Sequence, residues 1–127
     1  MGRGPAATAS VITMDDNRYC PFFHHTVELL GRRWSGVILK VLAVGPARFG
    51  DIRDKIPGLS DRLLTNRLAE FEAEGIAVRC ERDGVSCYRL TDRGQAVEPV
   101  LDAVAVLGQG WAALEGPADK PGRIRSA

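Results

Sequence analysis

The 127-residue sequence has no uninterrupted run of about twenty apolar residues, so no membrane-spanning helix is expected. Residues 1–13 lack the apolar centre and the small-residue cleavage pattern of a secretory signal peptide. There are only three cysteines, and an odd number in one domain does not suit a secreted disulfide framework. These features favour a protein of the reducing cytoplasm that does not associate with membranes.

Motifs for catalysis and for metal binding are missing as well. No glycine-rich phosphate loop follows a predicted strand, and no nucleophile is paired with a convincing base. There is no Cys-x-x-Cys pair, and the adjacent His24 and His25 point about 100° apart on a predicted helix, so a zinc site with Cys20 is not expected. We therefore predict no catalytic residue, no metal and no cofactor.

The net charge of +1 gives the whole chain no strong attraction to a polyanion, but the cations are unevenly placed. Six cations and two acids lie between Arg32 and Pro57, a local balance of +4, whereas acids gather at Glu70, Glu72 and Glu74. Such a basic region can bind phosphates, or it can be an ordinary solvated surface.

The composition predicts one folded domain between two tails. Residues 1–15 are rich in Gly, Ala, Ser and Thr, and residues 116–127 carry Pro117 and Pro121, so both ends are expected to be flexible. Residues 16–115 have helical apolar spacing, interrupted by one segment of β-forming residues. We expect helices at 21–30, about 33–44, 49–56 and 61–74, a hairpin within 76–90, and one long helix after Thr91.

The helices on either side of Pro57-Gly58-Leu59-Ser60 predict a helix-turn-helix. Ser60 is a good N-cap for the second helix, whose apolar stripe is Leu64, Leu68 and Phe71. The opposite side then carries Arg62 and Asn66, one turn apart, with the smaller Thr65 and Ala69. Arginine can bind guanine bidentately and asparagine can bind adenine in the same way, so this side suits the major groove. The alternative is an ordinary exposed helix face.

The hairpin that follows directly predicts a wing. Asp83-Gly84 favours a narrow turn, and Arg82 beside it can approach the minor groove or flanking phosphates. The expected fold is thus mostly α with a small β-hairpin wing, a winged helix-turn-helix. The predicted DNA-binding residues are Ser60, Arg62, Thr65, Asn66, Arg67 (toward phosphate), Arg79 and Arg82.

The last predicted helix has an apolar stripe longer than a small monomer's core needs. We interpret it as a dimerisation surface, the alternative being that it all belongs to the chain's own core. Pro99 removes one backbone hydrogen bond and is expected to bend the helix. The predicted dimerisation residues are Val97, Val100, Leu101, Val104, Leu107 and Trp111.

An ordered set of short motifs resembles the HxlR family of bacterial winged-helix regulators, which is related to MarR-like regulators. The resemblance implies a cytoplasmic homodimer that binds an inverted-repeat operator on double-stranded DNA, with its first and last helices forming the dimer interface. The wing departs from the family pattern, since its loop is short and holds two extra cysteines. The matching residues are Cys20-Pro21, Leu29–Trp34, Arg48–Ile52, Gly58–Ser60, Leu64-Thr65, Arg67-Leu68, Glu74–Ile76, Tyr88–Gly94 and Pro99–Leu101.

The cysteines suggest two possible redox features. Cys20 directly precedes a predicted helix, whose positive end favours a reactive thiolate, and HxlR-type regulators with a similar arrangement use an N-terminal cysteine to sense oxidants or electrophiles. Cys80 and Cys87 face each other if the wing turn is the two-residue loop Asp83-Gly84. A three-residue loop would instead pair Cys80 with Ser86, and the sequence favours neither register.

The leading functional interpretation is a sequence-specific DNA-binding transcriptional regulator, repressor or activator, that responds to an oxidant or a small-molecule effector. A pocket beside Trp34 or Trp111 would hold such an effector, although tryptophans are more often core residues. The alternative is a winged-helix adaptor that binds proteins without specific DNA binding. An adaptor would favour apolar anchors on the outward side of the second helix, where only an exposed Leu63 would supply one.

Overall fold

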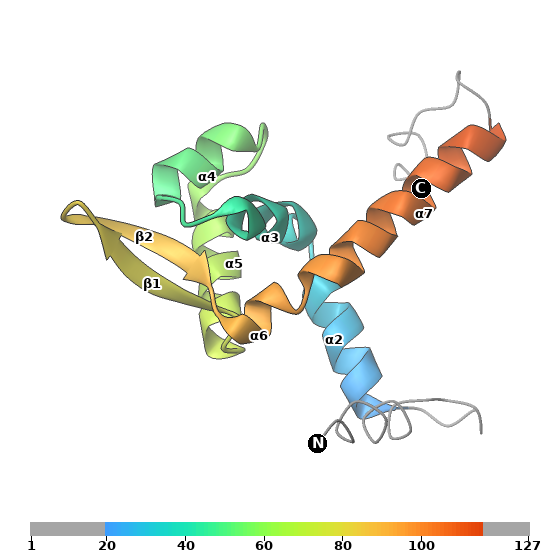
Figure 1. Ribbon diagram of the computed structural model, residues 1–127, viewed down its shortest axis with the longest axis horizontal. Coiled ribbons are helices and arrows are strands. Elements are labelled where there is room, and N and C mark those ends of the chain that lie inside the picture. Colours follow the sequence, from blue (N-terminus) through green and yellow to red (C-terminus); the bar gives the residue numbers. More distant parts are fainter. Residues whose placement is uncertain (1–19, 116–127) are drawn as a thin grey trace. The chain divides into compact units, whose positions relative to one another are not determined.

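The computed structural model describes residues 20–115 (Figure 1). The predicted tails, 1–15 and 116–127, lie outside the described residues. The chain divides between Gly36 and Val37 into two compact units. The first contains helix α2 (Pro21–Gly31), and the second runs from within α3 (Ser35–Val44) to the end of α7 (Glu98–Glu115).

Helix α2 confirms the first predicted helix to within one residue. Pro21 occupies the first turn, where its missing N–H costs no helical hydrogen bond, and Cys20 is the N-cap residue. No residue of α2 is buried. Phe22, Phe23 and Val27 are 67%, 54% and 50% exposed, so this helix presents an uncovered apolar surface.

The core of the second unit lies among α3, α4 (Phe49–Lys55), α5 (Asp61–Ala73) and the hairpin of β1 (Ala77–Arg82) and β2 (Val85–Leu90) (Figure 1). Each helix contributes apolar side chains at helical spacing, and the base of the hairpin adds Ala77 and Leu90. The largest side chains with almost no exposed surface in this unit are Phe71, Ile38, Leu39, Ile52, Leu64 and Leu68.

The hairpin resolves the two registers that the sequence left open. Cys80 pairs with Cys87, and Arg82 with Val85, so the loop has two residues and the three-residue alternative is wrong. Asp83 and Gly84 have φ of 53° and 76°, the left-handed conformations that a type I′ turn requires. The wing is also joined to the segment between α3 and α4, where Ala47 and Tyr88 exchange backbone hydrogen bonds of 3.0 and 2.9 Å.

The prediction of one long final helix after Thr91 is wrong in one respect, because the structure has two helices there. Thr91 caps only the short α6 (Asp92–Gln95), and its hydroxyl accepts the Gly94 N–H at 3.1 Å. Helix α7 starts after the break, at Glu98. Pro99 explains the interruption, since it cannot donate to the Gln95 carbonyl and its ring would collide with that group in a continuous helix.

None of the residues of α7 is buried, so its apolar stripe is not the core of the described chain. The polar side of α7 is the one linked to α3, through an ion pair of 3.5 Å between Lys40 and Asp102. By length and composition alone, one 18-residue window within Asp92–Glu115, with a mean hydropathy of 1.2, is apolar enough to cross a membrane. Since α7 also carries a polar side, this composition equally suits a helix that pairs with another protein surface.

Candidate nucleic-acid interface

The turn between α4 and α5 is anchored in the core. Ile56 and Leu59 are 3% and 6% exposed, and the Leu59 N–H donates to the Ile56 carbonyl at 3.2 Å. Gly58 between them has a φ of 91°, which a residue with a side chain rarely adopts. The angle between the two helices is therefore set by buried side chains as well as by the turn backbone.

Two polar contacts fix the beginning of α5. The Ser60 hydroxyl accepts the Leu63 N–H at 3.1 Å and confirms the predicted N-cap. Arg53 of α4 reaches across the turn to the Asp61 carboxylate at 3.2 Å. Its hydrogen bond to Asp61 and the charge of that carboxylate raise the pKa of Arg53, and Asp54 adds a smaller contribution of the same sign. Arg53 thus links the two helices.

The outward side of α5 is the one that the sequence predicted. Leu64, Leu68 and Phe71 are buried, and the opposite side is polar and exposed. Leu63 was expected to be exposed but is half-buried, so it is a poor anchor for a protein partner. Arg62 and Asn66 make no side-chain hydrogen bond or ion pair within residues 20–115, which leaves their donors available to a ligand. The exposed residues of this side are Arg62, Thr65, Asn66 and Ala69.

Arg67 was predicted to contact a phosphate, but in the structure it pairs with another residue of α5. Its side chain is only 12% exposed and pairs with Glu70, three residues along the helix, at 3.1 Å. At this spacing the two side chains lie on adjacent turns, so the pair forms locally. The structure thus brings together Ser60, Arg62, Thr65 and Asn66 and turns Arg67 toward α5 itself.

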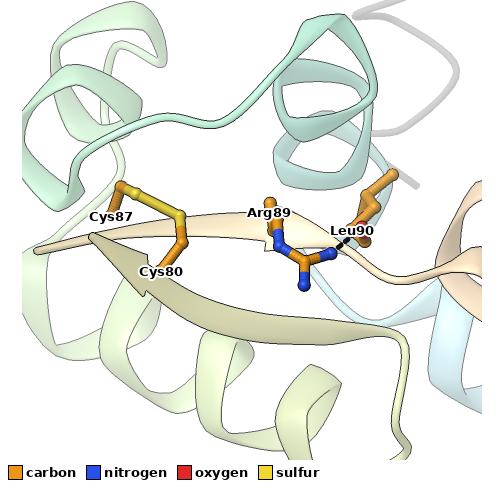
Figure 2. Close-up of a disulfide and its surroundings, with 4 residues drawn as sticks. All are labelled: Cys80, Cys87, Arg89 and Leu90. Carbon is orange, nitrogen blue, oxygen red and sulfur yellow. Dashed lines mark hydrogen bonds between the residues drawn. A yellow bond between two sulfur atoms is a disulfide. The ribbon is translucent and has the colours of Figure 1, made fainter. Parts of the chain in front are cut away.

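The two wing arginines of the predicted site differ in their contacts. Arg79 forms an exposed ion pair of 3.7 Å with Glu72 of α5, and it lies 5.5 Å from the centre of the Tyr88 ring on the neighbouring strand of the wing. Arg82 is exposed beside the wing turn and has no ion pair among the described residues. Arg89, on the same hairpin, donates to the Leu90 carbonyl at 3.4 Å (Figure 2).

The sequence did not indicate that Arg48, a cation near the wing, belongs to the candidate DNA-binding site. Arg48, the N-cap residue of α4, lines a hollow of about 330 Å³ together with Arg82 of the wing. The Ala47–Tyr88 bridge brings these segments together, although they are more than thirty residues apart. No local sequence pattern predicts an isolated bridge of this kind, so only the charge of Arg48 hinted at a role.

Comparison with known proteins decides the family. A model of the HxlR-like helix-turn-helix family matches residues 29–115. The chain belongs to the HxlR-like helix-turn-helix family. It is 36% identical over 101 residues to the uncharacterised HTH-type transcriptional regulator YvaP of Bacillus subtilis, covering 77% of this chain and 94% of that protein. Over 99 residues it is 37% identical to the regulator YodB of the same organism, covering 76% and 85%.

Solved structures of similar regulators share the fold. The reduced form of YodB is 35% identical, covers 70% of this chain and 90% of its own, and has a TM-score of 0.64. The oxidised form of the redox regulator HypR is 30% identical, covers 72% and 96%, and has a TM-score of 0.65. The chain is accordingly a winged helix-turn-helix transcriptional regulator of the HxlR-like family, and its relatives are regulators rather than enzymes.

The predicted redox residue of this HxlR-like chain, Cys20, is a free cysteine with 8% of its surface exposed. Its carbonyl accepts the His24 N–H at 3.0 Å, while its side chain makes no capping hydrogen bond. Its thiol lies at the start of α2, as predicted, but an oxidant must first gain access to it. Residues 20–115 contain no cluster of three or more metal-binding side chains.

Proposed function

We propose that this regulator binds an inverted-repeat operator in the cytoplasm as a homodimer, with one α5 in the major groove of each half-site. The observation that carries the proposal is that Arg62 and Asn66 are exposed on one side of α5, while the opposite side of the same helix is buried in the core. Because the helix itself is fixed by its buried side, only the side chains of Arg62 and Asn66 have to be ordered when they bind base edges. Thr65 and Ala69 are small enough to let the helix approach closely.

The dimer part of the proposal rests on uncovered apolar surface. Val100, Val104, Leu107 and Trp111 of α7 are 48–60% exposed, and α2 adds Phe22 and Phe23. An apolar stripe of this length is unusual on a monomer in water. A second copy of the chain is the partner proposed for this surface, because an inverted repeat calls for a two-fold dimer whose two recognition helices lie about 34 Å apart, one turn of DNA. The predicted interface also includes Leu101, and Val97 just before α7, both half-buried.

An adaptor without specific DNA binding is less well supported. Such a module needs apolar anchors on α5, and the half-buried Leu63 is the one large apolar residue near its outward side. The residues proposed to contact bases are Arg62, Thr65 and Asn66, whereas Ser60, Arg67, Arg79 and Arg82 are proposed to contact or position the phosphate backbone. Arg67 and Arg79 would have to exchange their ion pairs for phosphates, so we expect small contributions from both.

Base recognition by α5 gives a prediction for Arg62→Ala and Asn66→Ala. Each variant should lower operator affinity by about 1–3 kcal/mol while changing affinity for random DNA little, because bidentate base contacts carry the discrimination. Competition binding at one fixed salt concentration measures both affinities. Lys55→Ala, at an exposed cation on α4, is the matched control and should leave the ratio of the two affinities unchanged. Equal weakening of operator and random DNA by Arg62→Ala would refute base recognition.

We also propose Cys20 as the thiol through which an oxidant or electrophile releases DNA. The proposal is supported by its place at the start of α2, within the proposed dimer surface, and by relatives: YodB structures exist in quinone-bound and diamide-treated forms. We expect Cys20→Ser to bind DNA normally and to lose most of the release that diamide causes, measured by gel shift. Unchanged release in Cys20→Ser would exclude this role.

A further inference from the structure

The wing contains a disulfide between Cys80 of β1 and Cys87 of β2 (Figure 2). The two residues are direct cross-strand partners with their Cα atoms 4.9 Å apart. Cys87 is 2% exposed, whereas Cys80 is half-buried and accessible to solvent. The bond closes a loop over a sequence separation of seven, so it restricts few arrangements of the unfolded chain and acts mainly on the wing tip.

The disulfide lies at the last packed position before the tip of the wing. Every residue from Glu81 to Ser86 is exposed, so no side chain of the tip is held by the core. An isolated two-stranded hairpin is marginally stable in water. The position of Arg82 consequently depends on the turn, the strand hydrogen bonds and the disulfide.

Cys87 also lines the hollow that contains Arg48 and Arg82. Cys87, Arg82 and Arg48 all line it, and neither arginine has an ion pair among residues 20–115. Arg82 comes from the wing and Arg48 from the start of α4, so the distance between their guanidinium groups depends on how the wing is held. Two guanidinium groups on one hollow are suited to a backbone phosphate. Asp51 and Asp83 also line it and would repel a phosphate, so both arginines are needed.

We propose that the Cys80–Cys87 pair controls this hollow: the disulfide holds Arg82 beside Arg48, so that together they bind one DNA backbone phosphate, and reduction loosens that contact. The inference rests on the proposed DNA binding, and it assigns a redox function to a site other than Cys20. Disulfides in the cytosol are commonly transient and regulatory. Oxidation of the wing should strengthen DNA binding, the opposite of the effect proposed for Cys20.

The chemistry is a two-electron exchange. One thiolate of a dithiol attacks Cys80 Sγ, forms a mixed disulfide with it and releases Cys87 as the thiolate. The second thiol of the dithiol then attacks the dithiol sulfur of the mixed disulfide and releases Cys80. The dithiol becomes a cyclic disulfide, and its two electrons and two protons are now on the thiols of Cys80 and Cys87. Hydrogen peroxide reverses the step by accepting two electrons and, with the two thiol protons, forming two molecules of water. Because Cys87 is buried, Cys80 is the sulfur that exchange partners reach first.

The test uses the full chain carrying Cys20→Ser, so that the wing cysteines are the only thiols left. Operator affinity is measured after treatment with hydrogen peroxide and after treatment with dithiothreitol, with thiol content determined by mass spectrometry. We expect about 3- to 10-fold tighter binding in the oxidised form, since the wing tip no longer has to be ordered on binding. Adding Cys80→Ser should abolish the difference and give the affinity of the reduced form, and it leaves the buried Cys87 in place.

Two further variants in the Cys20→Ser background test the phosphate contact. Arg82→Ala and Arg48→Ala should each remove most of the redox difference and lower the slope of log affinity against log salt by about one. Equal affinities of the oxidised and reduced forms, or a redox response that persists in Cys80→Ser, would overturn the inference while leaving the proposed function intact. Absence of DNA binding in both redox states would overturn both.

Discussion

Replacing Val104 and Leu107 of α7 with glutamate is expected to make the protein monomeric and to lower its operator affinity by about 100-fold or more. Both side chains lie on the apolar stripe and are 60% and 50% exposed. Two buried carboxylates in each subunit would make the proposed interface unfavourable. A monomer binds one half-site and loses the gain of two linked sites, which is about 100- to 10,000-fold.

Val106→Glu is the matched control for this prediction. Val106 is 66% exposed on the same helix, but at 100° per residue it lies opposite the stripe, near Asp102 and Gln109. Sedimentation equilibrium gives the oligomeric state of each variant, and gel shift gives the operator affinity. The dimer proposal would be wrong if Val104→Glu/Leu107→Glu remained dimeric, or if the wild-type chain sedimented as a monomer.

Gly94→Ala is expected to destabilise the protein by about 3 kcal/mol, the upper end of the usual cost of overpacking. Gly94 is buried in α6, and a Cβ built there would overlap the carbonyl oxygen of Ile76. That oxygen accepts the Thr91 N–H at 3.1 Å, so moving it away would weaken the link between the hairpin and α6. The obstacle is backbone, which cannot rotate aside as a side chain can.

Gly110→Ala is the matched control for Gly94→Ala, because it adds the same methyl group at a position with open space. Nothing lies within 4 Å of a Cβ at this position, which is inside α7 at the edge of the apolar stripe. Alanine is favoured over glycine in a helix by about 1 kcal/mol, so this variant should be slightly more stable than the wild type. Urea denaturation at one fixed protein concentration compares them, because dimer stability depends on concentration. If Gly94→Ala unfolded at the same urea concentration as the wild type, the close approach at Ile76 would not be a constraint.

The part of the fold that local chemistry determines could be predicted from the sequence. Ser60 caps α5 as expected, and the spacing of Leu64, Leu68 and Phe71 defines the buried side of that helix. The exposure of Arg62 and Asn66 follows from the same periodicity. Periodicity and capping act within a few residues, so one sequence is enough to see them.

Features that depend on tertiary contacts were not predictable in this way. Helix α3 is apolar nearly all round, so its spacing did not show that Leu39 would be buried and Val37 47% exposed. The hairpin register was open until the pairing of Cys80 with Cys87 was seen, because opposing sequence signals favoured different loops. The hollow between Arg48 and Arg82 requires a bridge between distant segments, and Arg67 could bind either phosphate or Glu70.

Binding of α5 in the major groove can be measured as protection of guanine N7 from methylation, because N7 lies in that groove and is the atom that arginine would cover. The full-length wild-type chain is bound to DNA from beside its own gene, and the DNA is then methylated with dimethyl sulfate. We expect two protected clusters about one helical turn apart, with protection lost in Arg62→Ala at a concentration that still saturates the DNA. Saturated DNA whose guanine N7 atoms all remain reactive would rule out α5 in the major groove, and a single protected cluster would rule out a dimer on an inverted repeat.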